Sequence, residues 1–191
     1  MFINLTKIKE KTDRKEIYDA SYKLAREMFI SASGGVGYPN STKITAKPNW
    51  TSYRPDNDDP TYHMGIITDL GFIEGFLNGV KTRGPQDVYI RECASPQRWE
   101  ELGYAQMCAK NNFNLKDLSS KNFWELGDEI IFKSVDGVVF KEVGFMAPMN
   151  ASDTFLINMA KFKAHTMGIS ASIKNLQGIT GKRKKRVENY I

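Results

Sequence analysis

The sequence predicts an α/β fold with a mostly parallel sheet and helices on both faces, a Rossmann-like three-layer arrangement with a β-hairpin insertion. Short apolar runs of strand length alternate along the chain with segments of helical periodicity, which favours a parallel sheet. Asp136-Gly137 lies between two further apolar runs, a typical hairpin signal. A chain of 191 residues is long enough for one domain with a real core and short for two.

The composition is that of a soluble globular protein, with 41% apolar and 26% charged residues. No stretch approaches the roughly 18 uninterrupted apolar residues that a membrane-spanning helix needs, so no membrane association is expected. The first residues carry several charges where a signal peptide requires an apolar centre. We therefore expect a cytoplasmic location.

The first predicted elements are an amphipathic helix and a short strand. The helix is expected over Asp13 to Ile30, with Asp13 and Glu16 spaced as a capping box. Residues 31–40 are predicted to be a connector, because their GGxG order lacks the fingerprint of a dinucleotide-binding loop. The strand is expected over Lys43 to Lys47 and ends at the following proline.

Two helices and a strand are predicted in the middle of the chain. The first helix is expected to run from Thr68, its cap, to Thr82. A strand over residues 87–93 follows. Ser95-Pro96 is expected to open the next helix, and Cys108 belongs to the apolar stripe of that helix, so it is predicted to be a core residue.

The hairpin and one more strand complete the predicted sheet. The hairpin strands are expected over residues 129–132 and 138–140. The last strand is expected over Phe155 to Asn158. A polar segment rich in lysine follows it.

Cysteine and aspartate spacing predicts no metal site. Cys93 and Cys108 form no ligand pair and are expected to be free thiols. Because iron–sulfur clusters need about four thiolates, this segment alone cannot hold one. Asp56, Asp58 and Asp59 lack the glycine and glutamate of a calcium loop and are expected to be solvated.

The positive charge is concentrated near the C-terminus. The net charge of +5 equals the charge of the run Lys182 to Arg186, so the rest of the chain is balanced. We expect a single α/β domain over residues 1–181, forming the N-terminal part of a longer protein, and a basic segment over 182–191. Nucleic-acid binding is not favoured, because no aromatic residues interleave with the basic ones.

The segment after the last predicted strand carries the candidate site. Lys161, Lys163, His165 and Lys174 follow that strand, and ligands of α/β proteins bind outside the carboxyl ends of strands. The lysines would attract carboxylate or phosphate. His165 has a side chain suited to proton transfer or metal ligation near neutral pH, and a lysine crowded by cations becomes a nucleophile.

Other strand ends are expected at the same edge. Lys47 and Asn49 end the earlier strand and are predicted to line the site. Glu92 ends a third strand and is placed to pair with a site lysine. Cys93, beside it, is interpreted as a small buried side chain rather than a reactive thiolate.

Three blocks of the sequence resemble the domain-of-unknown-function 362 family: residues 44–49, 158–165 and 173–178. Their order and spacing also match, over residues 43–178. Members often carry a ferredoxin-like module or are associated with iron–sulfur clusters, and their reaction is generally unassigned. The resemblance implies a partner of that kind, or a C-terminal half, which this segment lacks. It also supports the candidate site, with His165 and Lys174 as catalytic residues and, as ligand-binding residues, Lys47, Asn49, Lys161, Lys163, Asn175 and Gly178.

A fainter similarity runs to the nickel-dependent lactate racemase family. There a histidine is followed, after small residues, by a lysine that holds a nickel-pincer cofactor. His165 and Lys174 match these positions, although Ser172-Ile173 replaces the expected double glycine. This similarity implies the half of a metal-pincer enzyme as an alternative function.

The function expected from the sequence is binding of an anionic small molecule or cofactor at the strand edge. In its enzymatic version, which rests on the family association, the domain would belong to an iron–sulfur-linked oxidoreductase. The alternatives are the racemase-like half, a nucleic-acid or protein-binding module that uses the 182–186 run, and a scaffold half that pairs with a C-terminal half. The substrate and the cofactor stay open.

Overall fold

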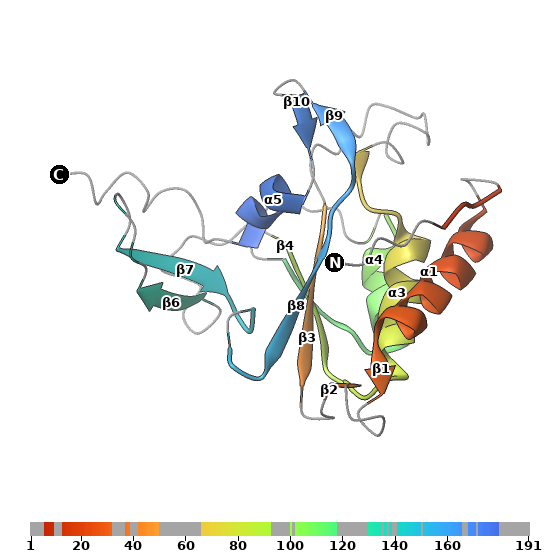
Figure 1. The fold of residues 1–191 in the computed structure, drawn as a ribbon, viewed down its shortest axis with the longest axis horizontal. Helices are drawn as coiled ribbons and strands as arrows, with labels where there is room; N and C mark the ends of the chain where they lie inside the picture. Colours follow the sequence, from red (N-terminus) through yellow and green to blue (C-terminus); the bar gives the residue numbers. More distant parts are fainter. Residues whose placement is uncertain are drawn as a thin grey trace.

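A four-stranded parallel sheet forms the centre of the computed structural model (Figure 1). The strands lie in the order β5 (Asn114–Asp117), β4 (Val88–Glu92), β3 (Lys43–Pro48) and β8 (Thr154–Met159). The structure describes residues 6–9, 13–31, 37–38, 42–49, 66–92, 100, 102–117, 130–134, 136, 138, 141–149, 151–165, 168–170 and 172–179.

The central strand β3 fixes the register of the sheet. It pairs with β8 from Lys43 opposite Thr154 to Pro48 opposite Met159, and with β4 through Ile44 opposite Val88. Its residues from Ile44 onward are buried on both faces, as expected for a strand inside a parallel sheet. A short parallel pair, β1 (Ile30–Ser31) and β2 (Gly37–Tyr38), lies at the opposite end of the sheet from α5 (Ser172–Asn175), β9 (Lys163–His165) and β10 (Gly168–Ser170) (Figure 1).

Helices α1 (Arg14–Met28), α3 (Leu70–Lys81) and α4 (Tyr104–Asn111) lie on one side of the sheet (Figure 1). The alternate strand residues that face them are apolar and buried. They form the main core with one face of α3 and with α4, including Ile44, Ala46, Ile73, Leu77, Val80, Ile90, Met107, Cys108 and Ile157. The core position predicted for Cys108 is confirmed.

Glycines on α3 allow α1 to approach closely. Gly71, Gly75 and Gly79 are spaced four residues apart and therefore share one face of the helix. A Cβ at each would collide with backbone oxygens of α1, for example 2.8 Å from the Arg14 oxygen at Gly71 and 2.6 Å from the Tyr22 oxygen at Gly79. The two helices are thus packed backbone to backbone.

The opposite face of the sheet is covered by the hairpin β6 (Ile130–Ser134) and β7 (Glu142–Met146), with α5 (Ser172–Asn175) and the 3-10 helix η4 (Leu176–Ile179) (Figure 1). A second core cluster lies there, formed by Met146, Met149 and Ile179 with Phe145, Leu156 and Leu176 packed against it. The predicted α/β class, with a mostly parallel sheet and a hairpin insertion, is confirmed.

Several predicted helix boundaries are wrong by a few residues. Helix α1 is capped by Asp13 as predicted, but it ends at Met28, before the strand β1. Asp69 rather than Thr68 caps α3, and its carboxylate accepts from the Phe72 amide at 3.0 Å. Helix α4 begins at Tyr104, after Gly103 in the left-handed region at φ 79°, and the start predicted at Ser95-Pro96 lies outside the described residues.

The strand predictions need corrections as well. The second hairpin strand is β7, at 142–146 instead of 138–140, and Val138 is 99% exposed. Strand β5 was not predicted. Nor is β8 the last strand, because β9 (Lys163–His165) pairs with β10 (Gly168–Ser170) as an antiparallel hairpin where a loop was predicted.

Some predictions fall outside the described residues, namely those for the glycines before Gly37, for the Asp56 group, for Cys93 and Ser95, and for the 182–186 run. Within the described ranges, no helix has both the length and the apolar character needed to cross a bilayer.

Substituting Gly75→Ala tests the close packing of α1 on α3. Intrinsic helix propensity alone would stabilise the helix by about 1 kcal/mol. We expect a net loss of about 1–3 kcal/mol instead, because the new methyl group would collide with the Tyr18 backbone. Urea denaturation followed by circular dichroism measures the change, and its sign decides: a more stable variant would contradict the packing described here.

Candidate functional site

The carboxyl ends of β3 and β8 form a topological switch point. After β3 the chain continues to α3 on one face of the sheet, whereas after β8 it continues to α5 on the other face (Figure 1). Two adjacent parallel strands whose connections leave to opposite faces open a crevice at their carboxyl ends, where ligands of α/β proteins bind. The predicted site residues of both strands meet here.

A buried ion pair lies at this edge of the sheet. The Lys47 ammonium, from the end of β3, pairs with the Glu92 carboxylate, from the end of β4, and each residue is only 1% exposed. Lys47 Nζ also donates to the Pro48 carbonyl at 2.7 Å and to Asn175 Oδ1 at 3.1 Å. The predicted pairing of Glu92 with a site lysine is confirmed, and it neutralises the charge of Lys47.

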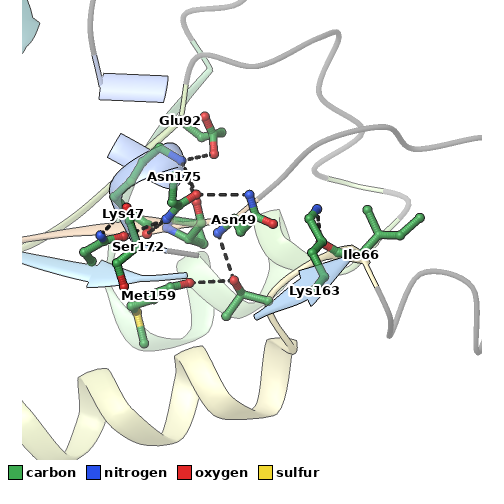
Figure 2. Close-up of polar contacts among 11 residues, drawn as sticks. Lys47, Asn49, Ile66, Glu92, Met159, Lys163, Ser172 and Asn175 are labelled. Atoms are coloured by element: carbon green, nitrogen blue, oxygen red, sulfur yellow. Dashed lines mark hydrogen bonds and ion pairs between the residues drawn. The ribbon is translucent and has the colours of Figure 1, made fainter. Parts of the chain in front are cut away.

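Asn175, on α5, connects the ends of β3 and β8. Its Oδ1 accepts from Lys47 Nζ and, at 3.1 Å, from Asn49 Nδ2. Its Nδ2 donates to the Lys47 carbonyl at 3.0 Å and to Asn158 Oδ1 at 2.7 Å. Asn158 Nδ2 in turn donates to the Ser172 carbonyl at 2.8 Å, so a chain of amides fastens α5 to the sheet (Figure 2).

Asn49 and Thr68 join the same network. The backbone N–H of Asn49 donates to Thr68 Oγ1 at 2.8 Å, and the backbone N–H of Thr68 donates to the Asn49 backbone carbonyl at 3.0 Å. Thr68 Oγ1 also donates to the Met159 carbonyl at 2.6 Å, across to β8. These bonds explain why Thr68 does not cap α3: its hydroxyl is used between the two strands.

One polar atom of the network is left over. Asn49 is 9% exposed, and its Oδ1 accepts no hydrogen bond from any residue in the described part of the chain. A buried acceptor without a donor costs roughly 1–3 kcal/mol. Such an atom at the carboxyl edge of a parallel sheet is a candidate contact for a ligand.

Gly178, on η4, lies directly against the ion pair. A Cβ there would collide with Glu92 Oε1 and with Lys47 Cε, and would lie 3.0 Å from Lys47 Nζ. The absence of a side chain at Gly178 therefore lets η4 close over the charged pair. This gives Gly178 a packing role, while the predicted contact with a ligand stays a prediction.

Lys163 is a buried lysine at the same edge of the sheet. Its Nζ donates to the Ile66 carbonyl at 2.6 Å, and the side chain lies apart from the amide network in Figure 2. Burial lowers the pKa of Lys163 to about 8, and the charges of Lys174, Lys161 and Lys47 act in the same direction. Glu92 opposes this shift only in part.

The structure thus brings together most of the predicted residues. Lys47, Asn49, Asn175 and Gly178 share one network, and Lys161 and Lys174 are close enough to Lys163 to influence its pKa. His165 belongs to β9, but its side chain is outside the described residues. Its catalytic role and that of Lys174 stay predictions.

Two members of the network, Asn158 and Thr68, were not predicted as site residues. Asn158 lies opposite Lys47 in the β3–β8 register, so its place depends on strand pairing. Away from the network, burial raises the pKa of the Cys108 thiol to about 12, which fits a core residue. Among the side chains that the structure describes, no three His, Cys, Asp or Glu residues are placed to hold a metal ion.

Comparison with known proteins identifies the family. The model of the family "Domain of unknown function (DUF362)" matches residues 44–190. The chain belongs to this family, and its network residues Lys47, Asn49, Asn158, Asn175 and Gly178 all lie within the matched region. Neither the curated proteins nor the solved structures yield a match.

Substituting Gly178→Ala tests the closure of η4 over the ion pair. We expect the free energy of unfolding to fall by about 1–3 kcal/mol, because the methyl group forces η4 or the pair to shift. Urea denaturation provides the measurement. The matched control is Ile173→Ala on the neighbouring α5, where the side chain is 87% exposed and little change is expected. Equal stability of both variants would show that η4 does not close on the pair.

Proposed function

We propose that the carboxyl ends of β3 and β8 bind a small anion, held by Lys163 together with Lys161 and Lys174. The observation that carries this proposal is the placement of Lys163, which is only 9% exposed and whose Nζ donates to the Ile66 carbonyl at 2.6 Å. Burial, followed by the charges of Lys174 and Lys161, lowers the pKa of this side chain. Cations gathered at a partly buried sheet edge repel one another, and an anion bound among them removes that repulsion.

The described acidic group that acts on Lys163 does not cancel this positive charge. Among the residues that the structure describes, Glu92 acts on the pKa of Lys163, and its charge is already balanced by Lys47. The ion pair therefore contributes little net charge, whereas Lys161, Lys163 and Lys174 add positive charge at this edge of the sheet. Anions such as carboxylates and phosphates are the ligands that this charge selects.

The amide network gives the proposed site a fixed base. The side-chain amide of Asn175 is hydrogen-bonded to Lys47 of β3, to Asn158 of β8 and to Asn49, which follows β3. These bonds hold α5, and hence Lys174, against the sheet. Because the cations are already held in place, less conformational entropy is lost when the anion binds. Lys47 has a positioning role in this proposal.

Substituting Lys163→Met tests the proposal directly. The variant keeps most of the side-chain length and removes the charge, so the dissociation constant for inorganic phosphate at pH 7 should rise by roughly tenfold or more, as expected for loss of a charge-assisted contact. Isothermal titration calorimetry measures the affinity.

Lys23→Met is the matched control, because Lys23 is exposed on α1, on the opposite side of the sheet from α5. Its affinity for phosphate should equal that of the wild type. A wild-type protein that binds no phosphate, or equal weakening in both variants, would contradict an anion site at Lys163.

The pH dependence of anion binding should follow Lys163. Since its pKa is about 8 in the free protein, the ammonium is charged below pH 8 and loses its proton as the pH rises above it. Sulfate, whose charge is constant in this range, should therefore bind more weakly above pH 8. Near pH 8 to 9, binding should take up protons, because the anion favours charged Lys163.

Calorimetry in two buffers of different ionisation enthalpy measures this proton uptake. In Lys163→Met the uptake should vanish. An affinity for sulfate that stays constant from pH 7 to pH 10 in the wild type would contradict a role of Lys163 in holding the anion.

A further inference from the structure

The arrangement of the amide network restricts which anion fits. We infer that the ligand carries a hydrogen-bond donor beside its negative oxygens, and that this donor makes a hydrogen bond to Asn49 Oδ1. This inference rests on the proposed anion site and names the chemical class of its ligand. A protonated phosphate and a hydroxy acid both have this chemistry, since each presents a hydroxyl next to charged oxygens.

The orientation of Asn175 is the first step. Its amide can be placed in only one way, because Lys47 Nζ is a pure donor and must meet Oδ1. The Nδ2 group then faces two acceptors, the Lys47 carbonyl and Asn158 Oδ1. The charge of Lys47 thereby fixes which side of Asn175 accepts.

The orientation of Asn49 follows from that of Asn175. Asn175 Oδ1 accepts from the Asn49 side chain, so Asn49 must present its Nδ2 group there. Its Oδ1 is then the outward end of the chain of amides, and in Figure 2 it points away from Asn175, toward the side on which Lys163 is drawn. Rotating the Asn49 amide to change this would place two acceptors against each other.

Asn49 and Lys163 border the same short segment. The Asn49 backbone N–H donates to Thr68 Oγ1, and the Asn49 carbonyl accepts from the Thr68 backbone N–H. Lys163 Nζ donates to the Ile66 carbonyl. A cation and an acceptor that has no donor among the described side chains therefore flank residues 66–68. In Figure 2 the Asn49 side chain lies between Asn175 and Lys163, which is the placement that the inferred contact of one ligand with both residues requires.

This pairing discriminates between anions of similar size and charge. A negative oxygen placed against Asn49 Oδ1 is repelled, whereas a hydroxyl donates to it and removes a buried unsatisfied acceptor. Sulfate carries no proton near neutral pH, whereas phosphate carries at least one. Glycolate has a donor beside its carboxylate, whereas methoxyacetate has none.

The test compares these probes on the full chain at pH 7 by isothermal titration calorimetry. We expect tenfold or greater preference for the donor-bearing member of at least one pair, phosphate over sulfate or glycolate over methoxyacetate, as sites built around a hydrogen bond reject analogues that lack it by roughly this factor or more. The pair that shows the preference identifies the source of the donor.

Two variants separate this inference from the anion site itself. Asn49→Leu should abolish the preference while sulfate still binds, and Lys163→Met should weaken all anions while the remaining preference persists. Circular dichroism measures whether each variant is folded. If Asn49→Leu does not fold, Asn49→Ala replaces it. The affinity ratios of the wild-type protein within each pair of probes test the donor requirement without any variant.

Equal binding within both pairs by the wild type would overturn the donor requirement and leave the anion site standing. A preference that survives in Asn49→Leu would also overturn it, because a group other than Asn49 would then accept the hydrogen bond from the ligand. Binding of no probe at all would overturn both the inference and the anion site.

Discussion

The ion pair of Lys47 and Glu92 is the interaction on which the candidate site depends. Two charges taken out of water cost several kcal/mol each unless both are paired and hydrogen-bonded, and here both are almost completely buried. The structure meets that requirement by surrounding Lys47 with the Pro48 carbonyl and Asn175 Oδ1. Asn175 also holds α5 at the ends of the strands. The contact that stabilises the buried charge of Lys47 therefore also fixes the position of α5.

The switch point explains why this pair lies where it does. Strands β3 and β4 end side by side in a parallel register, which brings Lys47 and Glu92 together from distant parts of the sequence. Strand β8 adds Asn158 on the other side, opposite Lys47. A parallel sheet therefore collects polar side chains at one end, while the alternating apolar residues of the same strands form the core with α3.

The sequence predicted the fold class and much of the site. Alternating apolar runs were sufficient to predict strands β3, β4 and β8, and the residues at their carboxyl ends were correctly expected to meet. The errors have local causes. Thr68 resembles a helix cap in sequence, but its hydroxyl bonds to Asn49 and Met159 through tertiary contacts that no local pattern reveals.

Strand β5, four residues long, contains one large apolar side chain, Leu115. Its pairing with β4 therefore leaves little periodic signal. Asn158 begins the second of the blocks that resemble the family, but its place in the network depends on its register with Lys47 and on the orientation of Asn175, which the sequence does not reveal. Which group donates and which accepts is fixed only when all members of the network are assembled, so local sequence patterns do not reveal it.

The glycines of α3 also bear on where the folding unit begins. The family match starts at residue 44, yet Gly71, Gly75 and Gly79 form a bare trough that is filled by the backbone of α1, which precedes that point. A polypeptide truncated at Ile44 would leave this trough open to water and would lose Ala25, a fully buried member of the main core. Helix α1 is in that sense a structural part of the unit, and expression of the matched region should include it.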